Sequence, residues 1–111
     1  MKYNVYPTPS FKREAKKLIK KFASLKDELA LLGSELEANP KMGTDLGNNT
    51  YKIRLAIKSK NKGKSGGARV ITYVITEDQE IYLLKIYDKS EIENITTREL
   101  KILIEQILGK N

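Results

Sequence analysis

The chain has 111 residues and a mass of 12.6 kDa, which suits one compact domain over residues 1–111 and leaves no room for a second. It has no cysteine and no histidine, which excludes disulfides, thiolate metal sites, Ser-His and Cys-His catalytic pairs, and the usual histidine-ligated metal sites. The 21 lysines and arginines outnumber the 14 aspartates and glutamates, so the net charge of +7 favours a polyanionic partner, with nucleic acid the first choice.

The hydropathy pattern predicts a cytoplasmic protein without a membrane segment. Hydrophobic residues make up 40% and charged residues 32% of the chain, a composition typical of globular domains. The longest apolar runs are far shorter than the roughly 20 residues that span a bilayer. Residues 1–11 lack the hydrophobic stretch of a signal peptide.

The N-terminal part predicts a short strand followed by an amphipathic helix. Residues 2–6 alternate in polarity and end at Pro7, which is typical of a strand. A helix is predicted over residues 9–22, with Thr8 as its N-cap and Pro9 as its first residue. Helical spacing places apolar side chains on one face of this helix and basic side chains on the other.

A second helix is predicted to begin after Ser24, a candidate N-cap with Asp27 three residues later, and to end near residues 39–40. Its buried face is marked by a leucine stripe at helical spacing: Leu25, Leu29, Leu32 and Leu36. Such a stripe is more typical of a core than of a partner-binding zipper. Two amphipathic helices in tandem suggest an antiparallel helical hairpin.

The hydrophobic period changes to two after a polar, glycine-bearing stretch, residues 43–49, which we expect to be a loop. Residues 51–58 then predict a strand with an apolar face and a basic face that carries Lys52 and Arg54. A glycine- and lysine-rich hairpin connection is predicted over residues 59–67.

Residues 69–75 (RVITYVI) and 80–87 (EIYLLKIY) predict two further strands, separated by a turn at residues 76–79. A last helix is predicted after Thr96, with Glu99 completing a capping box. The order strand, helix, helix, three strands, helix predicts an α+β domain. We expect an antiparallel-rich sheet with the helical hairpin, and the helices generally, on one face.

The excess positive charge lies in one segment. Between residues 52 and 69 there is no acidic residue, and the basic residues there equal the whole net charge: Lys52, Arg54, Lys58, Lys60, Lys62, Lys64 and Arg69. A second basic cluster, over residues 12–21, is balanced by acids further along the chain. Single lysines in a loop usually serve solubility. An unopposed run favours polyanion binding, so the lysines from Lys58 to Lys64 are candidate RNA-binding residues.

Three segments, in this order, resemble the RelE/ParE toxin superfamily: Tyr51-Lys52-Ile53-Arg54, residues 62–71 (KGKSGGARVI) and residues 82–91 (YLLKIYDKSE). The lysine- and glycine-rich hairpin is similar to the RelE/HigB-like branch of bacterial type II toxin–antitoxin modules. The resemblance extends over almost the whole chain and is most specific from Tyr51 to Glu91. It implies a RelE-like fold.

The resemblance implies a toxin that enters the ribosomal A site and cuts messenger RNA there, without a metal or cofactor. It implies two partners. One is the ribosome with its message, contacted by the lysines of residues 58–64, and the other is a cognate antitoxin, a small DNA-binding protein encoded nearby. The family's basic active-site positions fall on these residues: Lys52, Arg54, Arg69 and Lys89. The histidine of many relatives is absent, and residues 94–96 (NIT) stand where a family tyrosine would fall. Tyr87 is a partial substitute.

Metal-free cleavage of RNA by its own 2′-hydroxyl needs a base, stabilisation of charge on phosphorus, and an acid for the departing 5′-oxygen. Lys52 and Arg54 leave one strand face about 7 Å apart, and a neighbouring strand can bring Arg69 opposite them. Arginine is the better phosphate clamp because its planar fork binds two oxygens. Crowded cations favour neutral lysine, which makes Lys52 the candidate base.

Plainer alternatives exist for the residues and for the function. Lys52 and Arg54 equally suit a solvated strand face, Lys89 suits a salt bridge with a neighbouring carboxylate, and Tyr87 suits a core aromatic. At the level of function, the alternatives to a nuclease are a ParE-like inhibitor of DNA gyrase that cuts nothing, and a non-catalytic RNA-binding module.

Overall fold

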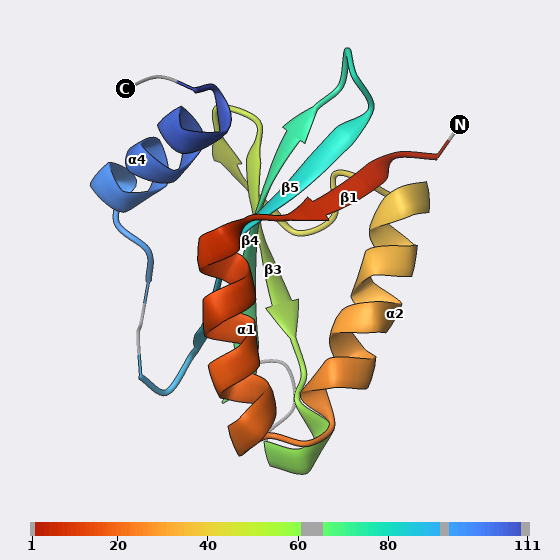
Figure 1. The fold of residues 1–111 in the computed structure, drawn as a ribbon, viewed down its shortest axis with the longest axis vertical. Helices are drawn as coiled ribbons and strands as arrows, with labels where there is room; N and C mark the ends of the chain where they lie inside the picture. The colour runs from red at the N-terminus through yellow and green to blue at the C-terminus, as the bar shows by residue number, and fades with distance from the viewer. Residues whose placement is uncertain (1, 61–65, 92–93, 110–111) are drawn as a thin grey trace.

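A five-stranded sheet lies at the centre of the fold, with helices packed on both of its faces (Figure 1). The computed structural model describes residues 2–60, 66–91 and 94–109. The strands are β1 (Asn4–Pro7), β2 (Thr44–Gly47), β3 (Thr50–Leu55), β4 (Ala68–Ile75) and β5 (Glu80–Asp88). The helices are α1 (Pro9–Lys21), α2 (Leu25–Ala38) and α4 (Thr97–Ile107), and η1 (Lys58–Lys60) is one 3₁₀ turn.

The strands lie in the order β1-β5-β4-β3-β2 across the sheet. Neighbouring strands are antiparallel, except that β1 runs parallel to β5. This arrangement confirms the predicted α+β class with an antiparallel-rich sheet. The predicted order of elements is also confirmed, with one strand added.

The added strand is β2, which lies within residues 43–49, so the prediction of a loop there is wrong in part. It pairs with β3 through a tight turn in which Gly47, Asn48 and Asn49 have positive φ angles of 87°, 53° and 63°. Glycine and asparagine adopt this left-handed region at low cost. Because β2 is a short, mostly exposed edge strand, it carries no apolar alternation that the sequence could reveal.

The two N-terminal helices begin where the sequence predicts, but only the first has the predicted side-chain cap. The Thr8 side chain accepts a hydrogen bond from the amide of Phe11 (3.3 Å), and its hydroxyl donates to the carbonyl of Leu83 (2.9 Å). Ser24 precedes α2, but its side chain forms no cap hydrogen bond. Its hydroxyl lies 2.9 Å from that of Ser59, so the start of α2 is tied to η1.

Helices α1 and α2 pack on one side of the sheet, which we call the first face. Their apolar side chains meet alternate residues of β3, β4 and β5. Leu29, within the predicted stripe, is half-buried at the margin of this core. The buried members of the core are Phe11, Ala15, Leu18, Leu25, Leu32, Leu36, Ile53, Ile57, Ala68, Val70, Val74, Ile81 and Ile86.

Helix α4 packs on the opposite side, the second face, which corrects the expectation that all helices share one face. Strand β4 explains the difference, because Val70 and Val74 belong to the first-face core whereas Ile71 packs with α4. A strand with apolar side chains on both faces of the sheet must be covered by other elements on both faces to keep those side chains from water. The predicted capping box of Thr96 and Glu99 is confirmed. In the described residues, no helix has the length and apolar character needed to cross a membrane.

Leu32→Asp should prevent folding, whereas Leu31→Asp should leave the fold intact. The side chain of Leu32 is 2% exposed in the core beneath α2, and that of Leu31 is 63% exposed. An unpaired buried carboxylate should cost about 3–5 kcal/mol, a large part of the stability of a small domain. Thermal unfolding followed by circular dichroism measures both variants. Equal melting temperatures would contradict this orientation of α2.

Candidate active site

Strand register brings predicted catalytic residues together on the second face of the sheet. Arg54 of β3 lies directly opposite Arg69 of β4, and Arg69 lies opposite Tyr87 of β5. Lys52 shares this face because it lies two residues before Arg54 on the same strand. We call Lys52, Arg54, Arg69 and Tyr87 the sheet-face cluster.

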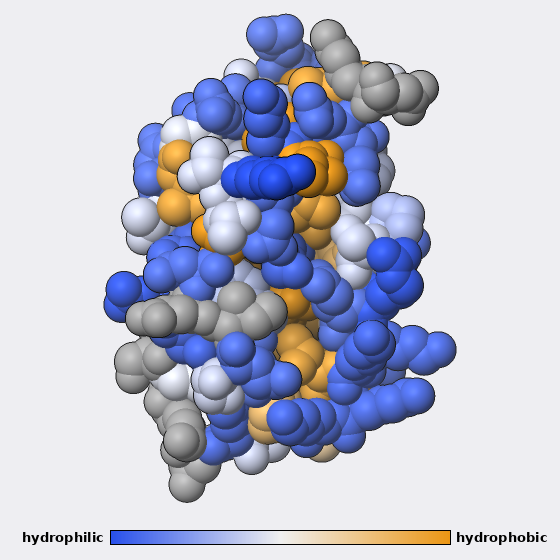
Figure 2. All heavy atoms as spheres, turned by 90° about the vertical axis from the view of Figure 1, so that its left-hand side faces the viewer, coloured by the Kyte–Doolittle hydropathy of each residue, from blue (hydrophilic) through white to orange (hydrophobic). Residues whose placement is uncertain are grey.

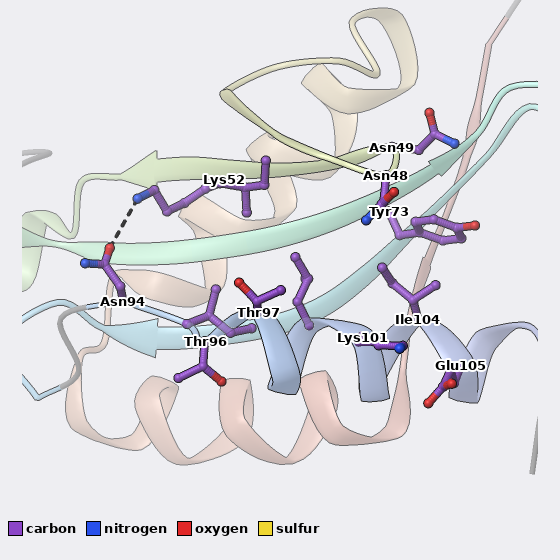
Figure 3. Close-up of a pocket in the computed structure, with 13 residues that line it drawn as sticks. Asn48, Asn49, Lys52, Tyr73, Asn94, Thr96, Thr97, Lys101, Ile104 and Glu105 are labelled. Carbon is purple, nitrogen blue, oxygen red and sulfur yellow. Dashed lines mark hydrogen bonds between the residues drawn. The ribbon is translucent and has the colours of Figure 1, made fainter.

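The members of the sheet-face cluster differ in exposure. Arg54 is exposed. Lys52 is half-buried, and its ammonium donates a hydrogen bond to the side-chain oxygen of Asn94 at 3.4 Å (Figure 3). Arg69 is only 4% exposed, and its guanidinium donates to the carbonyl of Ala68 at 3.1 Å. A ligand at the surface can therefore meet Arg54 and Lys52 directly, while Arg69 lies largely covered beside them.

Burial shifts the proton equilibria of Arg69 and Tyr87. Desolvation lowers the pKa of Arg69, and the neighbouring charge of Arg54 lowers this pKa further. Burial raises the pKa of Tyr87, which is 2% exposed, while the charge of Arg69 and the backbone of Ile95 oppose the rise. The phenol therefore stays protonated at neutral pH. Its hydroxyl has no hydrogen-bond partner of good geometry among the described residues.

Lys60, a candidate RNA-binding residue, points inward. Its ammonium contacts the carboxylate of Asp88 at the end of β5 and lies 3.2 Å from the hydroxyl of Ser90. The side chains of Lys60 and Asp88 are 9% and 2% exposed, and the ring of Phe22 lies 5.5 Å from the ammonium. Burial acts to raise the pKa of Asp88, but hydrogen bonds from Lys60 and Ser90 hold it below its ordinary value. We call this ion pair the Lys60–Asp88 clasp.

Of the other candidate residues, the structure describes Lys58 and Lys89. Lys58 is exposed at the start of η1, whereas Lys62 and Lys64 lie outside the described residues. Lys89 directly follows β5 and is half-buried, and its backbone amide donates to the carbonyl of Gly67 at 3.0 Å. This bond holds the ends of β4 and β5 together, and the Lys60–Asp88 clasp ties η1 to the end of β5.

A pocket of about 680 Å³ lies between α4 and the second face (Figure 3). Lys52, a member of the sheet-face cluster, and Asn94 line this pocket, and Tyr73 and Ile104 form part of its apolar wall. Asn48, from the turn between β2 and β3, also borders it. Sequence reasoning missed Asn94, because its contact with Lys52 joins residues 42 positions apart and no local pattern signals it.

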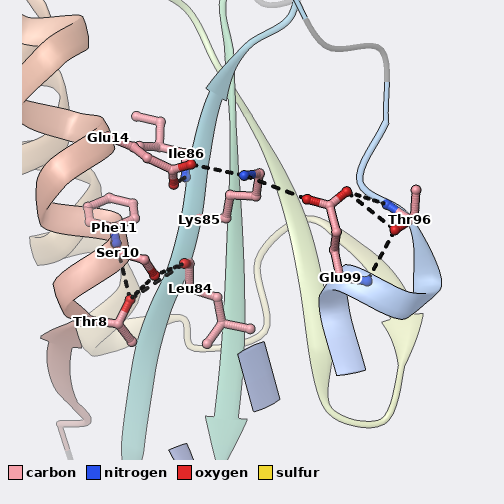
Figure 4. A network of polar contacts seen from close by, with 9 residues as sticks. All are labelled: Thr8, Ser10, Phe11, Glu14, Leu84, Lys85, Ile86, Thr96 and Glu99. Carbon is pink, nitrogen blue, oxygen red and sulfur yellow. Dashed lines mark hydrogen bonds and ion pairs between the residues drawn. The ribbon is translucent and has the colours of Figure 1, made fainter. Parts of the chain in front are cut away.

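Lys85 of β5 connects the helices of the two faces (Figure 4). Its ammonium lies 2.9 Å from the carboxylate of Glu14 in α1 and 3.9 Å from that of Glu99 in α4. Glu14 also accepts a hydrogen bond from the backbone amide of Ile86 at 3.4 Å. The carboxylate of Glu14 is therefore directed to the sheet and not to the basic side chains of its own helix.

The sheet-face cluster is suited to binding a phosphate, because guanidinium and ammonium groups donate to its oxygens at fixed positions. In the described part of the chain, no three or more Asp, Glu, Cys or His side chains form a group that could hold a metal ion. The fold and the site together define a small, basic α+β protein with a cationic cluster on one face of its sheet.

Comparison with known proteins places this chain in a family. The family model described as "RelE toxin of RelE / RelB toxin-antitoxin system" matches residues 3–108, and the chain belongs to this family of toxins. The resemblance to RelE toxins drawn from the sequence is thereby confirmed.

Two solved structures share the fold. A double arginine-to-alanine mutant of E. coli toxin RelE in the free state has a TM-score of 0.59 and 18% identity, with 96% of this chain and 99% of that chain covered. A chain of the toxin–antitoxin complex RelBE2 from Mycobacterium tuberculosis has a TM-score of 0.54 and 16% identity, with 79% and 92% covered.

Lys60→Met should destabilise the protein by about 3–5 kcal/mol, because it leaves the buried carboxylate of Asp88 without its cation. Lys58→Met, at an exposed neighbour in η1, should change the free energy of unfolding by less than about 0.5 kcal/mol. Urea unfolding at neutral pH measures both. Equal free energies of unfolding for the two variants would show that the clasp contributes nothing.

The pH dependence of the folding stability follows from the direction in which the pKa of Asp88 is shifted. The folded-state pKa of Asp88 is lowered from its ordinary value of 3.8, so the stability that it contributes is fully present above that pH. It should be lost as the pH falls from there through the lower pKa of the folded state. Lys60→Met should therefore flatten this acid limb of the stability curve.

Proposed function

We propose that this toxin is a ribosome-dependent mRNA endonuclease of the HigB-like branch. It cleaves RNA by attack of the RNA's own 2′-hydroxyl, without a metal. The observation that carries the proposal is the strand register that sets Arg54 against Arg69 on the second face, with Lys52 beside them. Membership of the RelE toxin family supports it.

Arg54 is the proposed clamp on the scissile phosphate. It is the exposed arginine of the sheet-face cluster, and its planar fork can bind two phosphate oxygens while staying charged. Attack by the 2′-hydroxyl gives phosphorus a transient additional negative charge. A fixed donor aimed at such a charge typically contributes about 10²–10³ in rate.

Arg69 is the proposed second positive charge of the site. Like charges directly opposite each other on neighbouring strands disfavour a sheet, and the pKa of Arg69 is lowered partly by Arg54. A phosphate bound at Arg54 relieves this repulsion. The pairing therefore makes the site more favourable for an anion than either arginine would be alone.

Two residues are proposed to move protons. Lys52 is the base, because it lies on the same face as Arg54 and its bond to Asn94 orients the nitrogen. Tyr87 is the acid that protonates the departing 5′-oxygen, since burial keeps its phenol neutral. The same raised pKa argues against Tyr87 as the base. Lys89, at the end of β5, is a further phosphate contact.

The proposed partners are the ribosome with its message and a cognate antitoxin. Lys58 is the described exposed lysine of the basic connection, and Lys62 and Lys64 are assigned the same role from the sequence. The RelBE2 structure is a toxin–antitoxin complex, which supports an antitoxin as partner here. We infer a small DNA-binding antitoxin encoded nearby, action in the cytoplasm, and no cofactor.

The burial of part of the cluster favours one alternative, a ParE-like inhibitor of DNA gyrase. Arg69 and Tyr87 are 4% and 2% exposed, so this face could bind a protein target without reacting. Production of the toxin followed by mapping of message 5′ ends separates the functions. Codon-phased cuts support the nuclease, and intact message with DNA-damage signalling supports the gyrase inhibitor. If cells that produce the protein grow normally, the result would support the third function, a non-catalytic RNA-binding module.

Arg54→Ala and Arg69→Ala should each lower ribosome-dependent cleavage by about 10²–10³, or about 3–4 kcal/mol, because each removes a fixed charge from the transition state. Arg54→Lys should restore only part of the rate, since an ammonium cannot make the two-pronged contact. Lys41→Ala, at an exposed position outside the cluster, is the control. Circular dichroism confirms that each variant is folded. Parental cleavage rates in both folded alanine variants would refute the site.

Tyr87→Phe should leave the protein as stable as the parent, or more stable, and yet slow cleavage by about 10²-fold or more. The buried hydroxyl has no hydrogen-bond partner of good geometry among the described residues, so its removal relieves a desolvation penalty. The same change removes the proposed proton donor. Melting temperature and single-turnover cleavage give the two readouts. Unchanged cleavage would exclude Tyr87 as the acid.

A further inference from the structure

Asp88, at the end of β5, is a buried carboxylate that the proposed mechanism does not use. Hydrophilic side chains cover most of the molecular surface shown in Figure 2, because solvent stabilises charge. The side chain of Asp88 is only 2% exposed, although it lies between Tyr87 and Lys89 in the sequence. A free negative charge there would repel a phosphate, and Lys60 supplies the neutralising positive charge. Asp88 is therefore unsuited to binding phosphate itself.

One oxygen of Asp88 accepts three hydrogen bonds. This Oδ1 accepts from the Lys60 ammonium, from the backbone amide of Ser90 at 3.0 Å and from the hydroxyl of Ser90 at 2.8 Å. The backbone carbonyl of Asp88 accepts from the amide of Glu91 at 3.0 Å. An aspartate that bonds to the backbone two residues later closes a tight turn. Asp88 thereby fixes the backbone of the turn that contains Lys89.

This turn also contacts both sides of the connection between β3 and β4. Lys60, near the start of the connection, contacts Asp88. The carbonyl of Gly67, at its end, accepts a hydrogen bond from the amide of Lys89 at 3.0 Å. Strand β4, which carries Arg69, begins directly after Gly67. The turn therefore lies where the connection, β4 and β5 meet.

An ion pair as deeply buried as the Lys60–Asp88 clasp is weak evidence for a role in stability alone. Desolvation of the two charges offsets much of their attraction, and an apolar pair of similar volume often stabilises a fold equally well. An apolar side chain in place of Asp88 cannot accept hydrogen bonds from the amide and hydroxyl of Ser90. What a carboxylate adds at this position is therefore the fixed turn.

We propose that Asp88 is a positioning residue, which fixes the turn that places Lys89 against the phosphate bound by the sheet-face cluster. Lys60 neutralises the carboxylate of Asp88, so that no free negative charge lies beside the phosphate. The role in cleavage rests on the proposed function, in which Lys89 is a phosphate contact. The fixing of the turn does not rest on it.

The test compares two double variants that differ only at residue 88. Lys60→Met/Asp88→Leu, the leucine variant, replaces the clasp by an apolar pair. Lys60→Met/Asp88→Asn, the asparagine variant, keeps an oxygen that can accept from Ser90. The leucine variant should melt at the same temperature as the asparagine variant or higher, because the asparagine leaves a buried amide without its partner.

The more stable variant should nevertheless be the slower enzyme. In single-turnover cleavage at saturating ribosomes, the leucine variant should be about 10–10² times slower than the asparagine variant, as expected for a contact misplaced by about 1 Å. If Asp88 served stability alone, the rates would follow the melting temperatures. Equal rates in the two variants would overturn the proposal.

Combination with Lys89→Ala shows whether Asp88 acts through Lys89. In the Lys89→Ala background the leucine and asparagine variants should cleave at rates within about twofold of each other, because the contact that the turn places is absent. In the Arg54→Ala background the difference between them should persist. An undiminished difference in the Lys89→Ala background would show that Asp88 acts through another residue and would overturn the proposal.

Amide hydrogen exchange tests the turn without reference to cleavage. The amide of Lys89 should exchange at least about tenfold faster in the leucine variant than in the asparagine variant, although the fold of the leucine variant is at least as stable. Equal exchange would overturn the proposal. If the parent protein does not cut the message and the exchange difference is found, the nuclease is refuted and the fixing of the turn by Asp88 stands.

Ser90→Ala decides the question if the leucine variant does not fold. Ser90 is exposed, so this change should leave the fold intact. It removes one of the two hydrogen bonds from Ser90 to Asp88, and should speed exchange of the Lys89 amide and slow cleavage by about fivefold each. Ser90→Thr keeps a hydroxyl and is the control. Parental exchange and cleavage in Ser90→Ala would overturn the proposal.

Discussion

Strand β4 is buried on both sides of the sheet, and the rest of the structure depends on this constraint. Its alternate apolar side chains require α1 and α2 on the first face and α4 on the second. Arg69 is the one charged residue of β4, so a guanidinium is held within the central strand. Register then sets Arg54 and Tyr87 on either side of it. The candidate site is thus built by the same two-sided packing that stabilises the fold.

The elements that the sequence predicts correctly are those with a local signal. Each of these signals involves residues that are close together in the sequence. They are the β-branched run of β4, the Thr8 cap, and the capping box of Thr96 and Glu99. Strand β2 was missed because it is a four-residue edge strand in which Leu46 is the one apolar side chain, too few for an alternation to show. The Ser24–Ser59 contact was missed because it joins distant segments, so no periodicity or cap rule encodes it.

The same difference between local signals and long-range contacts explains which features of the candidate site could be predicted. Period-two alternation on β3 is enough to place Lys52 and Arg54 on one face, but the position of Arg69 opposite Arg54 requires the strand register. Neither the burial of Tyr87 nor the inward turn of Lys60 toward Asp88 can be read from composition, because both depend on which segments pack above β5. The basic residues of α1 are likewise balanced along the chain by the acids of α2, but no ion pair joins these two helices among the described residues.

The chemistry of the cut RNA ends distinguishes this mechanism from the alternatives. Attack by the 2′-hydroxyl leaves a 2′,3′-cyclic phosphate on one fragment and a 5′-hydroxyl on the other. Purified toxin acting on ribosomes loaded with a defined message should give both ends, identified by mass spectrometry of the fragments. Fragments with a 5′-phosphate, as left by attack of water, or a message that stays intact, would contradict a site in which Lys52, Arg54, Arg69 and Tyr87 cleave RNA.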